Sequence, residues 1–171
     1  MTSPSPAPTV TQYLTFLVAG DEYAVDILKV REILELGQVT KVPSMPAWIR
    51  GVVNLRGAVV PLVDLAAKFG LPATAPGKRT AVVVVEIALA GRLTVMGAVV
   101  DSVRQVLDLS PDQVEPPPPF GTQIRVEFLR GMTEADGKFI LLLDVDAVLS
   151  VDELLTAEEV AQEAEQEGGD R

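Results

Sequence analysis

Apolar and polar residues alternate along most of the chain in short runs that are separated by turn residues. The runs are rich in valine, isoleucine, leucine and aromatic residues, which suit a pleated, half-buried surface. Many short strands at close spacing favour a barrel or sandwich over a βαβ sheet. The expected strands, with the turns between them, are 13–18 and 23–25 around Gly20-Asp21, 51–54 and 58–63 around Leu55-Arg56-Gly57, 79–89 and 92–100 around Ala90-Gly91, and 139–143 after Asp136-Gly137.

Helical periodicity is confined to three segments. Ile27 to Leu34 places apolar residues at positions 27, 30, 33 and 34, which predicts a short helix. Asp64 to Phe69 predicts a single turn before a glycine. Ser150 to Glu167 begins with capping-box spacing and an acidic first turn, which predicts a C-terminal helix.

Three blocks of sequence recur in the same order in the two halves of the chain. A β-hairpin precedes each copy, so the pattern predicts two similar small β-barrels of about seventy residues. A hairpin stands before the first copy and a helix after the second, which leaves room for the lobes to exchange strands. The matching blocks are Val30–Leu36 with Val103–Leu109, Leu55-Arg56-Gly57 with Leu129-Arg130-Gly131, and strands 59–64 with 139–144, each ending in aspartate.

Composition excludes several classes of function. The 171 residues include no cysteine and no histidine, so thiolate, imidazole and most zinc chemistry is impossible. We therefore expect no catalytic residues, no cofactor and no metal. The net charge of −10 includes −7 from positions 152–171, and no basic footprint for nucleic acid is visible. Apolar runs fall short of the roughly 20 residues of a membrane helix, so we expect a cytoplasmic protein without direct membrane insertion.

Several longer motifs occur in order along the chain: 23–33 (YAVDILKVREI), 39–43 (VTKVP), 47–57 (AWIRGVVNLRG), 59–64 (VVPLVD), 99–103 (VVDSV), and 115–118 (EPPP) with Phe120-Gly121. Together these motifs resemble those of CheW-like domains. The resemblance covers about Gln12 to Leu149, and its joint pattern is specific although each piece alone is weak. It implies two intertwined SH3-like five-stranded β-barrels, a mainly β fold with a short helix and a C-terminal helix. The chain departs from the family in a proline run of four and an acidic C-terminal tail.

The resemblance also implies a function and a binding surface. CheW-like proteins are non-catalytic adaptors that join the cytoplasmic tips of chemoreceptors to the regulatory domain of the CheA histidine kinase. We expect recruitment to membrane-anchored receptor arrays, with kinase contacts from both barrels that we do not assign to residues. The domain would span residues 11–155, between a disordered tail at 1–10 and an acidic helix end or tail at 156–171. The receptor-binding positions that the family implies are Glu32, Arg56, Gly57, Val30 and Asn54.

Three of these residues also have a simpler interpretation. Arg56 is equally a solvated turn arginine, and Glu32, on the predicted helix, a plain surface glutamate whose second-half counterpart is Gln105. Val30 suits a core as well as an interface. Arg130 holds the place matching Arg56, where a structural or surface role is as consistent.

Other features favour structural roles. Trp48, the only tryptophan, is expected to be half-buried packing. Asp144 and Asp146 lack the clustered acids of a metal or phospho-acceptor site.

Two functional alternatives stay open, the first implied by the same family resemblance and the second by the residues. A CheW-like adaptor could serve another kinase array, such as one for pilus motility. A carboxylate-based hydrolase in a small β-barrel would need two acids converging in one pocket, and no pair is marked out by its surroundings.

Overall fold

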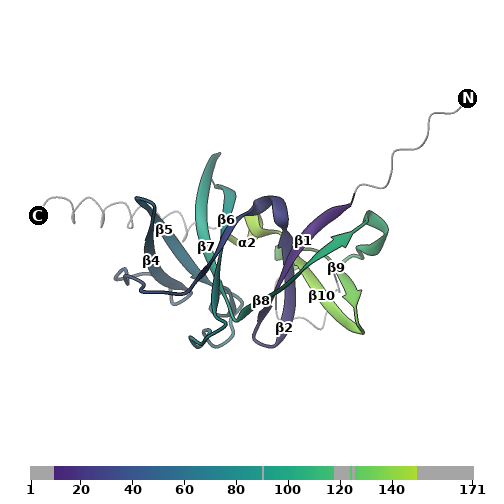
Figure 1. Cartoon of the computed structure of the whole chain (residues 1–171), viewed down its shortest axis with the longest axis horizontal. Helices are drawn as coiled ribbons and strands as arrows, with labels where there is room; N and C mark the ends of the chain where they lie inside the picture. Colours follow the sequence, from purple (N-terminus) through teal and green to yellow (C-terminus); the bar gives the residue numbers. More distant parts are fainter. Residues whose placement is uncertain (1–9, 90, 118–123, 125, 150–171) are drawn as a thin grey trace, which may run out of the picture.

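Two five-stranded sheets, each curled into a barrel, make up the fold of the computed structural model, which describes residues 10–89, 91–117, 124 and 126–149 (Figure 1). Barrel A has the strand order β8-β1-β2-β10-β9, and barrel B has the order β3-β6-β7-β5-β4. An isolated bridge closes each barrel, Thr40 with Val52 in barrel B and Glu115 with Met132 in barrel A. The strands are β1 (Thr11–Val18), β2 (Asp21–Asp26), β3 (Val30–Glu35), β4 (Ile49–Leu55), β5 (Ala58–Asp64), β6 (Ala81–Leu89), β7 (Arg92–Val100), β8 (Ser102–Leu109), β9 (Leu129–Ala135) and β10 (Lys138–Leu143).

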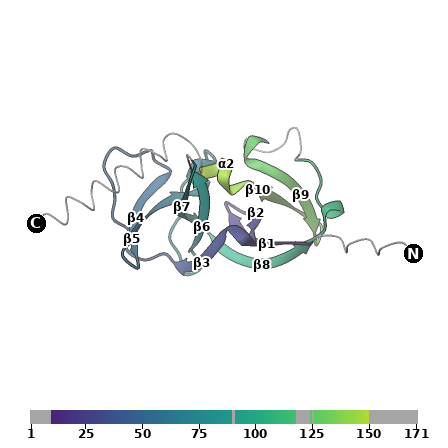
Figure 2. The ribbon, with the colours of Figure 1, turned by 90° about the horizontal axis from the view of Figure 1, so that it is seen from above.

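The barrels exchange strands. The β1–β2 hairpin lies in barrel A, but the chain then crosses to barrel B for β3. The β6–β7 hairpin lies in barrel B, and the chain crosses back to barrel A for β8. Figure 2 shows the two barrels side by side, and the prediction of two intertwined five-stranded barrels is confirmed.

The segment predicted as a short helix at Ile27–Leu34 is instead a single 3-10 turn, η1 (Ile27–Lys29), followed by strand β3. The side chain of Asp26 caps η1 by accepting a hydrogen bond from the Leu28 N–H at 2.9 Å. From position 30 onward, half-buried and exposed residues alternate, and the backbone pairs with β6. Helical spacing of four apolar residues was misleading because β-branched residues pair well in a sheet.

The repeat is real, but its second block was aligned wrongly. Leu129-Arg130-Gly131 does not form a turn, because it is the start of β9. The turn of that hairpin is Asp136-Gly137, with φ of 53° and 76°, like Arg56-Gly57, with φ of 52° and 86°. The structural counterpart of Arg56 is therefore Asp136, not Arg130.

Two glycines establish the correct alignment. A Cβ on Gly51 would meet the Thr40 carbonyl, and one on Gly131 would lie 2.7 Å from the Glu115 carbonyl, at the matching closure of the other barrel. Each glycine thus permits the close approach of two backbones where its barrel closes. Arg130 corresponds to Arg50, since each precedes one of these glycines.

The apolar core has three parts. The largest cluster lies between the barrels and includes Phe16, Tyr23, Ile87 and Met96. Smaller clusters fill barrel A, around Ile140, and barrel B. Strand β6 contributes to two clusters at once, which explains its unbroken run of four valines at 82–85: Val82 and Val84 pack inside barrel B, and Val83 and Val85 pack between the barrels.

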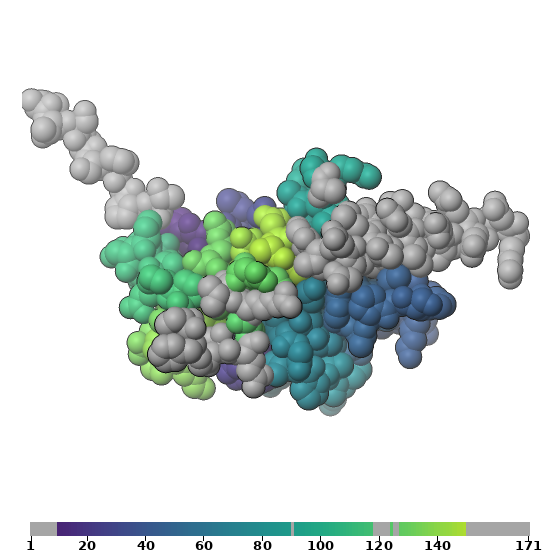
Figure 3. Space-filling model, turned by 180° about the vertical axis from the view of Figure 1, so that it is seen from behind, coloured from purple at the N-terminus to yellow at the C-terminus, as the bar shows by residue number. Residues whose placement is uncertain are grey.

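A short helix follows β5 in barrel B, and another follows β10 in barrel A. The turn predicted at Asp64–Phe69 is α1 (Leu65–Lys68), which the Asp64 side chain caps, whereas α2 (Val145–Leu149), capped by Asp144, was not predicted. Figure 3 shows α2 at the junction of the barrels. The helix predicted at Ser150–Glu167 and the tails at 1–9 and 156–171 lie outside the described residues. None of the described helices is long and apolar enough to cross a membrane.

Candidate partner-binding surfaces

Four of the five predicted receptor-binding residues meet at the β4–β5 turn. Arg56 and Gly57 occupy its two central positions, both with positive φ. The Gly57 N–H donates to the Asn54 side-chain oxygen at 3.0 Å, which fixes the turn. An Arg56 guanidinium nitrogen lies 2.8 Å from a Glu32 carboxylate oxygen. The turn thus presents an arginine that is 77% exposed and is tethered to the neighbouring strand.

Glu32 was expected on a helix, but it lies on β3, and its side chain is only 21% exposed. β3 and β4 are the two ends of the barrel B strand order, so the ion pair with Arg56 joins them across the closure of the barrel. The other carboxylate oxygen of Glu32 is buried and has no hydrogen-bond partner among the described residues. Val30 stands apart from this group, because it packs against the core between the barrels.

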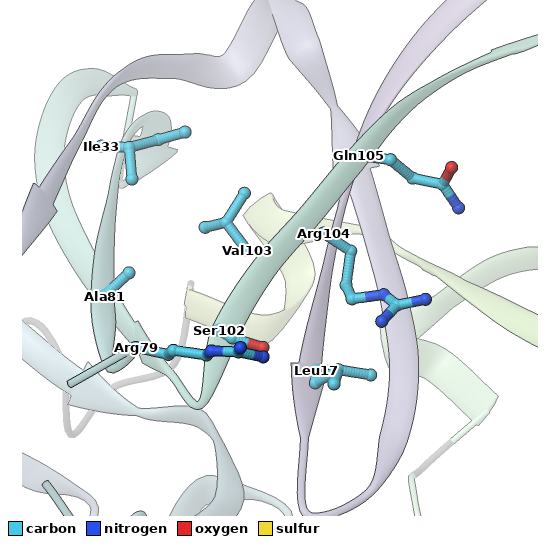
Figure 4. A pocket seen from close by; sticks show the side chains of 8 residues that line it. All are labelled: Leu17, Ile33, Arg79, Ala81, Ser102, Val103, Arg104 and Gln105. Atoms are coloured by element: carbon cyan, nitrogen blue, oxygen red, sulfur yellow. The ribbon is translucent and has the colours of Figure 1, made fainter. Parts of the chain in front are cut away.

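A groove of about 470 Å³ runs between the barrels. Ile33 of β3 and Val103 of β8 point into the space between these two strands, and Leu17 and Ala81 add further apolar surface (Figure 4). Ile33 is 46% exposed although it is large and aliphatic. The complete lining is Leu17, Ile33, Arg79, Ala81, Ser102, Val103, Arg104 and Gln105.

Sequence reasoning missed this groove, although the repeat carried the signal for it. The best-matched blocks, Val30–Leu36 and Val103–Leu109, contain the two strands that cross between the barrels. Exposed aliphatics occur at the same place in both, Ile33 at 46% and Val106 at 50%. Had these blocks been interpreted as strands, alternation would have placed Ile33 on the exposed face of β3, between Arg31 and Glu35.

The remaining candidates have structural roles. Trp48 is half-buried against the central core, with the Lys68 ammonium 4.0 Å from its ring centre. Asp144 caps α2, and Asp146 pairs with Lys29 at 2.8 Å. Among the described residues no group of three metal-binding side chains gathers in one place. The groove has no carboxylate in its lining, so it does not offer the paired acids that a hydrolase needs.

Comparison with known proteins decides the family. A family model described as CheW-like domain matches residues 12–153. The chain belongs to the CheW family. It is 36% identical over 151 residues to the chemotaxis protein CheW of Klebsiella aerogenes, covering 88% of this chain and 89% of that one. It is 34% identical over 142 residues to the chemotaxis protein CheW of Rhizobium meliloti, covering 83% and 89%.

A solved structure agrees with the fold. The crystal structure of the scaffolding protein TtCheW from Thermoanaerobacter tengcongensis superposes with a TM-score of 0.75 and 31% identity, covering 90% of this chain and 95% of that one. CheW-family proteins are non-catalytic scaffolds, so this chain is not an enzyme.

Proposed function

We propose that this CheW-family adaptor of chemotaxis joins the cytoplasmic tips of chemoreceptors to the regulatory domain of a CheA-type histidine kinase. The protein would be cytoplasmic and recruited to membrane-anchored arrays through these two contacts. The family match across residues 12–153 carries this proposal. Each contact is expected to be roughly micromolar, because an array gains strength from many joined contacts.

Arg56, Glu32, Gly57 and Asn54 would form one receptor-facing surface. A guanidinium has five donors, and the ion pair with Glu32 leaves most of them free for a receptor carboxylate or carbonyl. Gly57 and Asn54 would hold the turn, while Glu32 would orient the arginine. Val30 would contribute indirectly, because its packing against the core holds β3, and with it Glu32, in place.

The groove would form the second part of the same receptor contact. Ile33 follows Glu32 directly in β3, so one strand contributes to both surfaces. An amphipathic receptor helix that laid its aliphatic side chains over Leu17, Ile33 and Val103 would bury them as helix-in-groove recognition does elsewhere.

Charge reversal at the turn tests the first surface. Arg56→Glu should weaken binding to a receptor cytoplasmic fragment, and it should cost about 1–3 kcal/mol of stability because it removes the ion-pair partner of Glu32, which is only 21% exposed. Asp136→Arg reverses the matching turn of barrel A and should leave receptor binding unchanged.

A charge swap separates contact from positioning. The double variant Glu32→Arg with Arg56→Glu can restore the ion pair but presents the wrong charge to the receptor. If Arg56 touches the receptor, binding stays weak in the double variant. Full recovery of binding would contradict a direct contact and leave the pair with a structural role.

The partner identifies the pathway. Tagged protein recovered from its source cell should bring down a CheA-type kinase and chemoreceptors, and Arg56→Glu should lose the receptors selectively. Recovery of a pilus-motility kinase array instead would keep the adaptor class and change the pathway.

A further inference from the structure

The lining of the groove between the barrels includes two arginines and no carboxylate, although Glu22 lies opposite Leu17 in β2 and accepts a 3.4 Å hydrogen bond from the Gln105 side chain. Arg79 enters from the segment before β6, in barrel B, and Arg104 from β8, in barrel A. Neither forms a salt bridge with a described residue. In Figure 4 both guanidinium groups lie toward the Leu17 end of the groove. The groove is therefore apolar along one part and positively charged along another.

Arg104 and Arg31 occupy equivalent places in the two halves of the fold. Each is the extra residue of a β-bulge, since the pairing of β8 with β1 and that of β3 with β6 both skip one position there. The registers set Gln105 opposite Thr15 and Glu32 opposite Val84, which makes Thr15 the counterpart of Val84.

Among the described residues, only one of the two bulge arginines has an acidic salt-bridge partner. Arg31 pairs with Glu86, two residues beyond Val84. The counterpart of Glu86, two residues beyond Thr15, is Leu17, which lines the groove. The same bulge thus holds an internally neutralised arginine in barrel B and an arginine facing the groove without its acid in barrel A.

A helix that docks in this groove brings its flanking charges close to both arginines. Carboxylates there would form charge-assisted hydrogen bonds with the guanidinium groups, whereas lysines would meet two like charges in a partly dehydrated space. We propose that Arg79 and Arg104 make the groove selective for a partner helix whose aliphatic ridge is flanked by aspartate or glutamate. This inference rests on the proposed docking of a receptor helix in the groove.

Three helical peptides of about 20 residues test the selectivity. They share one ridge of leucine and isoleucine at helical spacing, and the flanking positions hold glutamate, glutamine or lysine. Binding to the full-length protein is measured by fluorescence anisotropy at two salt concentrations. We expect the glutamate peptide to bind at least about tenfold more tightly than the lysine peptide, and we expect added salt to reduce this difference.

Variants assign the effect to residues. Arg79→Glu with Arg104→Glu should invert the preference, whereas Arg92→Glu, at an exposed arginine outside the groove, should leave it unchanged. Ile33→Asp should weaken all three peptides, because it places a charge on the apolar wall.

The outcomes separate the two proposals. If the three peptides bind equally tightly and Ile33→Asp abolishes their binding, the charge selectivity is overturned but the docking of a helix in the groove still stands. If no peptide binds, or if Ile33→Asp does not weaken peptide binding, the proposed docking of a helix in the groove is overturned. If glutamine substitution of Glu158, Glu159, Glu163 and Glu165 in the full chain tightened glutamate-peptide binding tenfold, the acidic segment of this chain would be the occupant, against our proposal.

Discussion

The carboxylate of Asp64 should stabilise barrel B far more than its counterpart Asp144 stabilises barrel A. Asp64 is the last residue of β5, and Asp144 directly follows β10; each side chain caps the following helix by accepting a 3.1 Å hydrogen bond, from the Ala67 N–H and the Ala147 N–H respectively. Replacing either residue by alanine removes this cap, at a cost of about 1 kcal/mol. The caps therefore cancel when the two variants are compared.

Asp64 has two further partners. Its second oxygen accepts from an Arg50 guanidinium nitrogen at 2.9 Å and from the Thr74 N–H at 3.0 Å, in a side chain with no exposed surface. Asp144 is only half-buried and forms no salt bridge with a described residue. Asp64→Ala leaves the Thr74 N–H without its acceptor and ends a charged hydrogen bond, which together cost about 2 kcal/mol or more. Arg50 limits the loss, because it is partly exposed and keeps its bond to the Thr74 carbonyl.

Urea unfolding of the two variants measures the difference. Asp64→Ala should lose about 3 kcal/mol and Asp144→Ala about 1 kcal/mol, out of a total of roughly 5–15 kcal/mol. With an unfolding slope of about 2 kcal/mol per molar urea, their midpoints should differ by about 1 M. Midpoints within about 0.3 M of one another would refute the reasoning that the buried network, not the cap, dominates at Asp64.

Two further predictions concern the core. Burial first, and the nearby Asp21 charge second, raise the pKa of Tyr23 to about 12. Stability should therefore be full below pH 10, where the unfolded tyrosine starts to ionise, and should fall by roughly 3 kcal/mol as the pH approaches 12. Urea midpoints should lack this fall in Tyr23→Phe, and an equal fall in that variant would count against Tyr23 as the cause. A Cβ on Gly97 would lie 2.5 Å from Leu62 and 2.7 Å from Val82, so Gly97→Ala should cost about 1–3 kcal/mol in the same assay. Gly77→Ala, whose nearest contact is 3.8 Å, should be close to neutral, and equal costs at both glycines would contradict the packing argument.

Much of the fold followed from local sequence patterns. The hairpin turns at Gly91 and Gly137 were predicted because glycine with positive φ is a local requirement, which a single sequence displays. The exchange of strands followed from the repeat, since a hairpin precedes each copy. The prediction of a helix at 27–34 was wrong because the spacing of its apolar residues is helical, and only long-range pairing with β6 makes the segment from Val30 onward a strand.

The residues of the candidate site were proposed from the family resemblance, and their geometry could not be predicted from the sequence. Glu32 and Arg56 are 24 positions apart, and only closure of barrel B brings them into an ion pair. The groove was missed because its walls come from different barrels, and a local pattern cannot show which strands face each other. Arg130 was misplaced because a short motif, Leu-Arg-Gly, recurs in a strand as well as in a turn.

The internal symmetry of the fold gives a physical reason to seek binding where the halves differ. Features that both halves share, such as the glycines at the closures and the capping aspartates, are what the architecture itself requires. A residue present in one half only is not needed to build a barrel. Arg56 stands where barrel A has Asp136, and Leu17 stands where barrel B has Glu86. These two differences fall at the tethered turn and in the groove, so both proposed surfaces lie where the architecture places the least constraint on the side chain.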